Sequence, residues 1–512
     1  MYKRQVTGQP YPTDFGRAWK NVLFNQFHDT LAGTSIEAAY DDARDTYGEA
    51  LAIADRALVN SVQSMASQIH IPAVDGNMLL VVFNPLTFPI KAPIEIESSR
   101  WSSDAVLLDD QDRTIPHQSM QPATTAGRAR LAFMAELPAL GYQTYILRTP
   151  SSTARKFDQG QVVLAADNLL QGPRFRLEFN PQTGWITSLR DLKYGVDVFS
   201  GPAARPVVID DPHDTWGHGV FRWDQVIGEF GAAQIKLVEH GPVKSVLRVT
   251  SQYQASYLIQ DFSMYPGLDQ IDVQLTVDWR EHHKMLKLRF PVNLQDAAAT
   301  FEIPYGQIER PANADEEPFQ SWVDISGMVQ DRPYGFSLLN DGKYSLDVNG
   351  TDIGLTVLRS PVYAHHIPQE LLPERDYPYM DQGIQHFQYT LYPHTGSWQQ
   401  AGTVRRAAGL NQPPVALFTT YHPHGTLTQS DSFIAVTPEN ILVTVLKQAE
   451  GGHDLILRAY ETGGLPASGV IQLPRWGRTI EAGFEPGEIK TFRIPRDPLQ
   501  PVRETNLLED EI

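Results

Sequence analysis

The sequence contains no cysteine among its 512 residues. Disulfides, thiol catalysis and cysteine-ligated zinc are therefore excluded, and His, Asp and Glu remain as the possible metal ligands. Oxygen and nitrogen donors of this kind are typical of a catalytic metal site rather than a structural one. The missing cysteines also favour a cytoplasmic location.

Long apolar runs and an excess of basic charge are lacking as well. No stretch of about 18 residues is apolar enough to span a membrane. The 42 Lys and Arg residues are outnumbered by 60 Asp and Glu, which gives a formal charge of −18 and argues against binding to nucleic acid or to an anionic membrane surface. No phosphate-binding loop, nucleotide fingerprint or Ser-His-Asp arrangement stands out.

What is present is an ordinary globular composition, 42% hydrophobic and 20% charged, with a length that suggests about three domains. Residues 14–68 predict helices. A long helix is expected over residues 36–68, roughly 50 Å in length, with Pro72 ending it. Its stripe of apolar and small residues comprises Tyr40, Ala43, Tyr47, Ala50, Ala54, Ala57, Leu58, Val62, Met65 and Ile69. Such a stripe needs bundle partners, so this segment is either the remnant of a larger bundle or a self-contained hairpin that caps a β domain.

After residue 72 almost everything predicts β structure. Alternating or apolar runs at 79–83, 175–179, 271–277 and 441–446 are separated by Pro and Gly turns, as antiparallel sheets require. The expected fold class is mainly β with an N-terminal helical segment, a helical-bundle remnant followed by two or three antiparallel β-sandwich domains. Four domains are expected: 1–72 helical, 76–150 a small β-sandwich, 160–400 a large β-sandwich and 401–512 a last β domain. A break is expected at 405–414.

The most informative segment is 25–36, Asn-Gln-Phe-His-Asp-Thr-Leu-Ala-Gly-Thr-Ser-Ile. It places His28 and Asp29 between the end of one helix and the start of another. Thr34 and Glu37 form an S/T-x-x-E pattern that predicts a capping box for the second helix. A His-Asp pair held between two helices can be aimed rigidly into a neighbouring pocket, although a lone His of this kind is more often structural.

Together with Ala18 and Trp19, this segment resembles the middle-domain signature of the alpha-mannosidases of glycoside hydrolase family 38. Further strings resemble the family's β domains in the same order along the chain. They lie at residues 82–89, 175–191, 277–288, 303–311, 338–344, 358–361, 385–389 and 392–394.

The resemblance implies retaining hydrolysis of alpha-mannosides, in which one carboxylate attacks the anomeric carbon and a second acid protonates the leaving oxygen. It implies that His28 is a ligand of a catalytic zinc, or of another divalent metal, and that Asp29 lies against the bound mannose. Asp29 could equally be a simple acceptor at a helix terminus. The partner expected is an alpha-mannoside or a mannose-containing oligosaccharide, and a homo-oligomer stays open.

In the family the nucleophilic Asp and a His-x-Asp pair of zinc ligands lie on an N-terminal domain for which these 512 residues have no room. One ligand cannot hold zinc, which needs at least three from the protein. The catalytic residues are therefore unknown, and the sequence predicts negligible glycosidase activity for this chain alone. Met1 to Gln5 run almost directly into the first helix, as if a larger protein began upstream.

Two loops offer further substrate contacts. Residues 210–218 gather three Asp, two His and Trp216, which could stack on a pyranose face or belong to a solvated loop stiffened by Pro212. The family has a similar loop. Asp381 lies in a loop, 377–387, that is expected to reach the site from the β side. The His pairs at 282–283, 365–366 and 422/424 are interpreted as structural.

Two other functions remain open beside the truncated mannosidase. One is a non-catalytic carbohydrate-binding β-sandwich protein, and the other is one chain of a split mannosidase. The retained His28-Asp29 pair favours an enzyme, because a binding protein has no need of an orphan zinc ligand.

Overall fold

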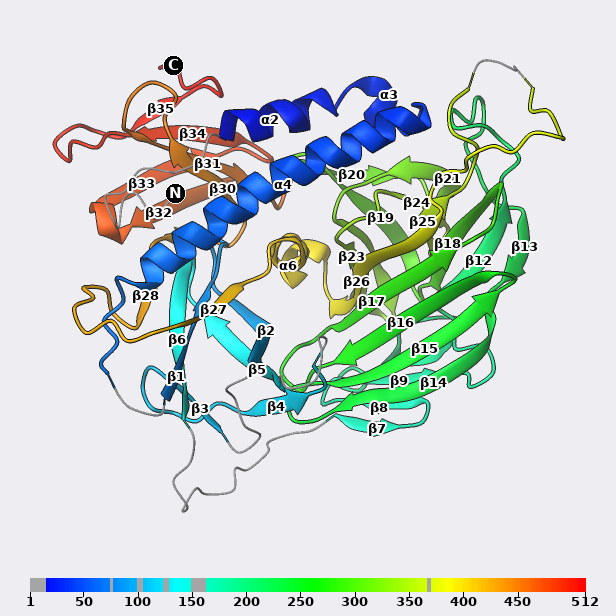
Figure 1. The fold of residues 1–512 in the computed structure, drawn as a ribbon, viewed down its shortest axis with the longest axis horizontal. Coiled ribbons are helices and arrows are strands. Elements are labelled where there is room, and N and C mark those ends of the chain that lie inside the picture. Colours follow the sequence, from blue (N-terminus) through cyan, green and yellow to red (C-terminus); the bar gives the residue numbers. More distant parts are fainter. Residues whose placement is uncertain (1–14, 74–76, 99–104, 123–128, 149–162, 366–369) are drawn as a thin grey trace.

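The computed structural model describes residues 15–73, 77–98, 105–122, 129–148, 163–365 and 370–512. Three helices come first: α2 (Phe15–Phe24), the single turn α3 (His28–Leu31) and the long α4 (Glu37–Ala66). Antiparallel sheets follow, as the alternating sequence pattern predicted. None of the described helices is both long and apolar enough to cross a membrane. The predicted class, mainly β after a helical segment, is confirmed (Figure 1).

The start and end of α4 differ from the prediction. Ile36 occupies the N-cap position and no side chain caps the helix, so the predicted capping box is wrong. The Thr34 hydroxyl is oriented away from the helix, because it donates instead to the carbonyl and carboxylate of Asp29. The helix also ends at Ala66, before Pro72, because Ile69 and Ile71 leave it to form isolated β-bridges with residues 427 and 422.

The helices form a hairpin that lies across the β domains (Figure 1). The C-terminal half of α4 buries Val62, Met65 and Ala66 in a core shared with β1 and β6. The N-terminal half packs mainly on α2. The outer side of the hairpin stays apolar and exposed, with Trp19 and Leu23 each 62% and Phe24 77% accessible. The predicted stripe on α4 is covered more fully than expected, since its members Ala43, Ala50, Ala57, Val62, Met65 and Ile69 are buried, and the exposed apolar face belongs to α2.

The small β-sandwich has two facing sheets. One contains, in order, β27 (Val415–Thr419), β1 (Asn77–Phe83), β6 (Gly141–Arg148) and β28 (Ser430–Ser432), with β3 (Val106–Asp109) also on β6. The other contains β2 (Ile90–Ser98), β5 (Ala129–Leu137) and β4 (His117–Met120). Because β27 and β28 come from beyond residue 401, the expected boundary there does not divide the sheets.

The large β-sandwich is built from three sheets. The nine-stranded sheet runs β14 (Gly231–His240), β15 (Ser245–Tyr253), β16 (Ser256–Met264), β17 (Ile271–Trp279), β26 (Gly383–Thr395), β23 (Arg332–Asn340), β22 (Trp322–Val329), β19 (Gln295–Ile303) and β20 (Gly306–Arg310). The six-stranded sheet runs β13 (Val226–Glu229), β12 (Arg205–Asp210), β18 (Lys284–Pro291), β25 (Asp352–Arg359), β24 (Ser345–Asn349) and β21 (Asn313–Pro318). The five-stranded sheet runs β11 (Val196–Asp197), β10 (Ile186–Asp191), β9 (Phe175–Phe179), β8 (Leu169–Gln171) and β7 (Leu164–Ala166).

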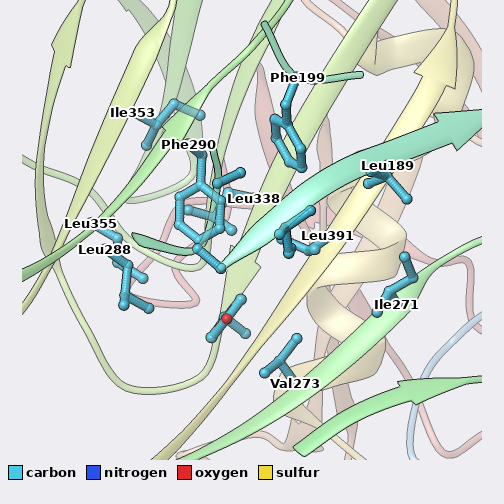
Figure 2. Packing of buried hydrophobic residues seen from close by; sticks show 14 of the residues in the cluster. Leu189, Phe199, Ile271, Val273, Leu288, Phe290, Leu338, Ile353, Leu355 and Leu391 are labelled. Carbon is cyan, nitrogen blue, oxygen red and sulfur yellow. The ribbon is translucent and has the colours of Figure 1, made fainter. Parts of the chain in front are cut away.

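One apolar core joins these three sheets. Figure 2 shows Leu189 from β10, Phe290 from β18, Val273 from β17 and Leu338 from β23 converging on the same interior. Each of these side chains is at most 1% exposed. The alternation read from the sequence at 175–179, 271–277 and 286–290 therefore places every second side chain in this core.

The last unit is a second small sandwich. Its sheets are β29 (Ala435–Thr437), β32 (Ala467–Leu473) and β33 (Arg478–Phe484) on one side, and β30 (Ile441–Gln448), β31 (Leu455–Glu461), β34 (Ile489–Ile494) and β35 (Arg503–Thr505) on the other. A short 3₁₀ turn, η1 (Pro474–Trp476), follows β32. Ile441, Leu457, Ile471 and Phe492 fill the interior between the sheets.

A helix, α6 (Thr403–Asn411), occupies most of the stretch 405–414 that was expected to be a break, so that prediction is wrong up to residue 411. The short helix α5 (Trp398–Ala401) precedes it. Gly402 joins them with a φ of +68°. The helix α6 forms despite Gly409 because Val404, Ala407 and Ala408 pack against two apolar clusters. It lies in the middle of the molecule, between the small and the large sandwiches (Figure 1).

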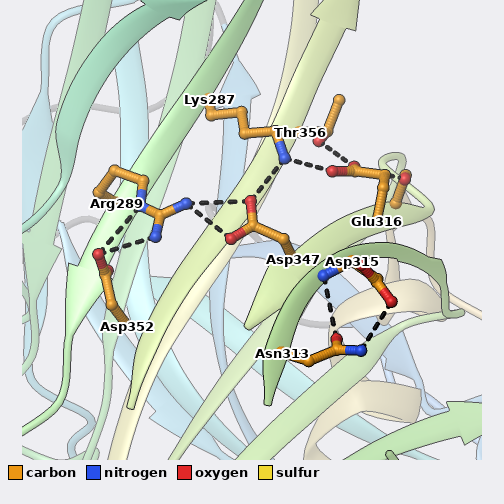
Figure 3. Close-up of polar contacts among 9 residues, drawn as sticks. Lys287, Arg289, Asn313, Asp315, Glu316, Asp347, Asp352 and Thr356 are labelled. Carbon is orange, nitrogen blue, oxygen red and sulfur yellow. Dashed lines mark hydrogen bonds and ion pairs between the residues drawn. The ribbon is translucent and has the colours of Figure 1, made fainter. Parts of the chain in front are cut away.

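A buried ionic network crosses the six-stranded sheet (Figure 3). Lys287 is completely buried and its ammonium contacts both Glu316 and Asp347, the latter at 2.5 Å. Arg289 pairs with Asp347 at 2.7 Å and with Asp352 at 2.8 Å. The network ties β21 to β18, β24 and β25. Since the Glu316 amide also donates to the Phe221 carbonyl, it anchors one end of the loop that carries Trp216.

Candidate functional site

His28 and Asp29 lie within α3, the single turn between the two arms of the helical hairpin. Both side chains are open to solvent, with 78% of His28 and 45% of Asp29 exposed, and their Nε2 and Oδ2 atoms are 3.6 Å apart. The residue at the end of α2, just before the turn, is fixed to α4. Buried Asn25 donates to the Thr46 hydroxyl at 2.7 Å, which holds the end of α2 on α4.

Tyr40 holds the turn from the other side. Its hydroxyl accepts a hydrogen bond from the Ser35 amide at 3.1 Å and lies 3.4 Å from the carbonyl oxygens of Asp29 and Thr30. The Thr34 amide donates to the Asp29 carbonyl at 2.9 Å. Gly33, at a φ of +80°, allows the chain to reverse here. His28 and Asp29 are therefore presented on a stiff turn although they are exposed.

A segment of the large sandwich packs against this turn. The Ala364 amide donates to the Ser35 carbonyl at 3.3 Å, and the Tyr363 ring lies 5.7 Å from the Tyr40 ring. Residues 361–363 pair with 378–380, which brings the following residue, Asp381, to the same place. The negative charges of Asp29 and Asp381 both help to raise the pKa of Tyr40, after the larger effect of burial. Asp29 and Asp381 therefore both lie near enough to Tyr40 to influence its pKa.

Asp381 is accessible to solvent, yet protein surrounds it on most sides. This crowding raises the pKa of its carboxyl group, whereas the charge of Lys343 and a hydrogen bond from the Arg359 amide at 3.2 Å act in the opposite direction. Burial in turn lowers the pKa of Lys343, and the charge of Asp381 opposes that shift. The Lys343 ammonium donates to Gln385 at 2.9 Å. The Lys343 ammonium and the Asp381 carboxylate therefore influence one another's pKa, although no ion pair within 4 Å joins them in the described part of the chain.

Arg359 connects this place to the loop that carries Trp216. Its guanidinium donates to both carboxylate oxygens of fully buried Asp211, at 2.6 and 3.0 Å, and to the carbonyls of Asp214 and Thr215. Trp223 donates to the same Asp211 carboxylate at 3.0 Å. Hydrogen bonds therefore fix the loop at Asp211, Asp214 and Thr215, although Pro212, His213, Asp214 and His218 are exposed to solvent. Half-buried Trp216 is stacked on His218 with 6.2 Å between ring centroids.

The predicted His pairs do not behave as strand residues. His282 and His283 precede β18 in a bend, with His283 at a φ of +50°. Both contact Tyr379: the His282 ring stacks on it at 3.8 Å and the His283 ring meets it edge-on at 5.2 Å. They support the strand end that leads to Asp381. His366 lies outside the described residues, and His422 and His424 lie at a bridge and a turn.

The described residues do not complete a metal site. No group of three or more His, Asp or Glu side chains among them is arranged to hold an ion. His28 and Asp29 could contribute one nitrogen and one oxygen ligand, which is fewer than zinc requires. No chemical step can be assigned to a metal from these residues.

The arrangement brings together two predicted residues, Asp29 and Asp381, and joins them to the Trp216 loop through Arg359. Sequence reasoning missed Arg359, Lys343, Tyr40 and Tyr363. Arg359 and Lys343 do lie in strings that resemble the family, 358–361 and 338–344, but nothing local indicated that they meet. Tyr40 was assigned to the apolar stripe, since its periodicity fits and its hydrogen bonds depend on a turn eleven residues away.

Family models match the two parts of the chain that form this site. Residues 5–65 match the alpha mannosidase middle domain, and residues 170–370 match the C-terminal domain of glycosyl hydrolases family 38. The chain belongs to glycoside hydrolase family 38. Alpha-mannosidase G of Dictyostelium discoideum is 25% identical over 94% of this chain, and alpha-mannosidase 2C1 of Mus musculus is 26% identical over 87%.

The fold agrees with that of solved family members. An alpha-mannosidase from Enterococcus faecalis V583 superposes with a TM-score of 0.78 at 16% identity, covering 96% of this chain and 65% of the other. This family-38 chain spans less than half the length of its curated relatives, 48% of the Dictyostelium protein and 40% of the mouse protein. Its matched portion corresponds to the family's middle and C-terminal domains.

Proposed function

We propose that this chain is the middle and C-terminal part of a retaining, zinc-dependent alpha-mannosidase. The single observation that carries the proposal is the stiff turn that presents His28 and Asp29, with Asp381 held beside it from the large sandwich. A carbohydrate-binding module would have no use for a solvent-facing His-Asp pair fixed from two domains. The family membership of both contributing segments points in the same direction.

In this proposal each domain has a separate task. The turn supplies His28 as one metal ligand and Asp29 as an acceptor for sugar hydroxyls. Asp381 and Trp216 bind the sugar from the β side, where Trp216 offers a ring face and Asp381 an acceptor. Neither acts as the nucleophile or the general acid. Zinc, when bound, would supply Lewis-acid polarisation of sugar hydroxyls.

The remaining metal ligands and the nucleophile would come from a further domain that contacts the exposed face of the hairpin. Trp19, Leu23, Phe24, Phe27 and Leu31 are each between 57% and 77% exposed there. An apolar surface of this size next to a candidate site is typical of a surface that another domain or chain covers. The chain alone is therefore expected to be inactive on alpha-mannosides.

The first experiment is to read the DNA upstream of the Met1 codon. A reading frame that continues for several hundred codons and encodes a His-x-Asp motif is the expected result. An in-frame stop codon close upstream would overturn the truncated-enzyme proposal and favour a split mannosidase, whose nucleophile domain is a separate chain.

The second experiment compares hydrolysis of a nitrophenyl alpha-mannoside by this chain and by the polypeptide that includes the upstream domain. Only the longer polypeptide should hydrolyse the substrate. There His28→Ala should remove bound zinc, measured by atomic absorption, while Asp29→Asn should raise KM and lower kcat with the metal retained. Arg190→Gln, at an exposed ion pair remote from the turn, is the control and should change neither. Enzyme-like turnover by the short chain would contradict the proposal.

A further inference from the structure

A polar groove of 1320 Å³ opens where three parts of the molecule meet: the small sandwich, the nine-stranded sheet and α6. In Figure 1, α6 is seen between the two sandwiches at this place. None of the candidate-site residues Asp29, Trp216, Arg359 or Asp381 lines the groove. It is therefore a second concave site that the proposed glycosidase function does not use.

The groove has a slight excess of basic side chains, whereas the chain as a whole is acidic. Its lining includes seven basic and six acidic side chains, whereas the whole chain has 42 basic and 60 acidic ones. Some of the basic groups are already neutralised. Arg130 and Lys244 share Glu95, and Arg248 pairs with Asp261 at 2.7 Å.

Arg405 of α6 is only weakly compensated by a carboxylate. Its side chain is only 19% exposed, and its nearest carboxylate, Glu439, is 3.9 Å away on a side chain that is 90% exposed. Its guanidinium lies 5.0 Å from the centroid of the Phe88 ring. Nε is buried and has no hydrogen-bond partner among the described residues. Burial lowers the pKa of Arg405, which expresses the same shortage of counter-charge.

Arg406 lines the same groove and is also held by neutral groups. Its guanidinium lies 4.2 Å from the centroid of the Tyr392 ring and donates to Gln270 at 2.9 Å. No carboxylate of the described residues lies within 4 Å of it. Lys91, from β2, reaches the groove near Gly267, and its only ion pair in the described part of the chain is with a 79%-exposed Glu136 at 3.3 Å.

We propose that this groove binds an oxyanion, either phosphate or a carboxylate, with Arg405 and Arg406 as its principal ligands. A largely buried guanidinium without a partner is costly, and a bound oxyanion would supply both the missing acceptor and the counter-charge. Arg405 and Arg406 both line the groove, and a guanidinium group suits phosphate and carboxylate oxygens because its paired N–H donors match that geometry. Hydroxyl and amide groups of Ser263, Gln274 and Gln388 line the rest of the groove and would accommodate a sugar that carries the anion.

The oxyanion could thus be free or borne by a sugar, and calorimetric titration of the full chain distinguishes these sources. The probes are inorganic phosphate, glucose 6-phosphate and glucose. Glucose 6-phosphate binding more tightly than phosphate identifies a sugar-borne anion, and equal affinities identify a free one. Either result supports the site, and glucose alone should not bind. If neither phosphate nor glucose 6-phosphate binds detectably at millimolar concentration, the proposal is overturned.

Variants locate the binding. Arg405→Gln and Arg406→Gln should each weaken anion affinity by about tenfold or more, because each removes charge-assisted hydrogen bonds. Arg190→Gln on β10, outside the groove, is the matched control and should bind as the wild type does. Circular dichroism checks folding of each variant, and Arg406→Gln serves if Arg405→Gln does not fold. Unchanged affinity in a folded arginine variant overturns the assignment. The outcome is independent of mannosidase activity.

Discussion

At the residue scale, buried charge is concentrated around Lys287, which has no exposed surface and two carboxylate partners. Lys287→Met would remove the one cation recorded for Glu316 and leave Asp347 with Arg289, which also pairs with Asp352. We expect this change to reduce the free energy of unfolding by about 3–5 kcal/mol, since breaking a buried pair leaves an uncompensated charge. Urea unfolding followed by tryptophan fluorescence measures the difference.

Lys284→Met, on the same strand, is the matched control for that substitution. Its ammonium donates only to the exposed carbonyl of His282 among the contacts recorded for it, so the change should stay within about 0.5 kcal/mol of wild type. If Lys287→Met unfolds at the same urea concentration as the control, Arg289 alone balances the network and the buried lysine is dispensable.

His283 gives the site region a defined pH dependence. Burial lowers the pKa of His283 below 6.5, and Asp211 opposes the shift only in part. As pH falls through 6.5, the unfolded chain gains a proton that the folded His283 does not take up until a lower pH. Stability is therefore lost on acidification between 6.5 and the folded pKa, and it is retained above 6.5.

The measurement compares thermal unfolding of the wild type and of His283→Asn between pH 7.5 and pH 5, approximate limits chosen to bracket an ordinary histidine pKa. The wild type should lose more stability over this range than the variant. His453→Asn, at an exposed position between β30 and β31, should keep the wild-type slope. Parallel pH profiles for wild type and His283→Asn would rule out this histidine as the source.

At the element scale, Gly402 and Gly409 allow one helix to be tested in two directions. Gly402 precedes α6 with a φ of +68°, whereas Gly409 lies inside the helix, and neither has an atom that an added Cβ would meet within 4 Å. Gly402→Ala should therefore destabilise by about 1 kcal/mol through backbone strain alone. Gly409→Ala should stabilise by up to about 1 kcal/mol through its higher helix propensity. Chemical denaturation of the pair checks both signs, and equal shifts would contradict the backbone argument.

The secondary-structure elements differ in how well the sequence could predict them. Strands such as β9 and β17 were found because every second residue is apolar, and β1 because it is a short continuous apolar run, which are local properties. The helix α6 was missed because Gly409 and the prolines that follow weaken its local signal, and packing of Val404 and Ala407 decides its conformation. The capping box failed because Thr34 has a second acceptor, Asp29, that the pattern does not reveal.

The candidate site was only partly predictable for the same reason. His28 and Asp29 belong to one recognisable string, so the sequence identified them together. Asp381, Arg359 and Asp211 meet through a contact between segments separated by 148 positions, and no local periodicity encodes that distance. Their roles, and those of His28 and Trp216 in binding metal and sugar, remain predictions.

At the scale of the whole molecule, the exposed apolar face of the helical hairpin governs association. Phe24 and Leu23 are 77% and 62% exposed and make up part of a continuous run along α2. We expect the isolated chain to self-associate through this face and Phe24→Ser to reduce that association, because apolar surface is then removed from the contact. Light scattering over a range of protein concentrations measures it.

Leu499→Ser is the control for this surface. Leu499 is 91% exposed but lies near the C-terminus, away from the hairpin. It should leave the mass distribution unchanged, and both variants should keep the unfolding stability of the wild type. A monomeric wild-type chain at all concentrations would show that the hairpin face does not by itself drive self-association.

The sheet that contains β1 and β6 also sets the order in which the chain can fold. Two of its other strands, β27 and β28, come from beyond residue 414, and the Tyr142 hydroxyl donates to a carbonyl 286 positions later. On the ribosome, the large sandwich would emerge complete while β1 and β6 still lacked their outer neighbours. The helix α4 packs on that same sheet, so the turn that carries His28 and Asp29 would reach its final position among the last parts of the protein. Such late closure of distant strands makes folding slow and exposes unpaired strand edges meanwhile.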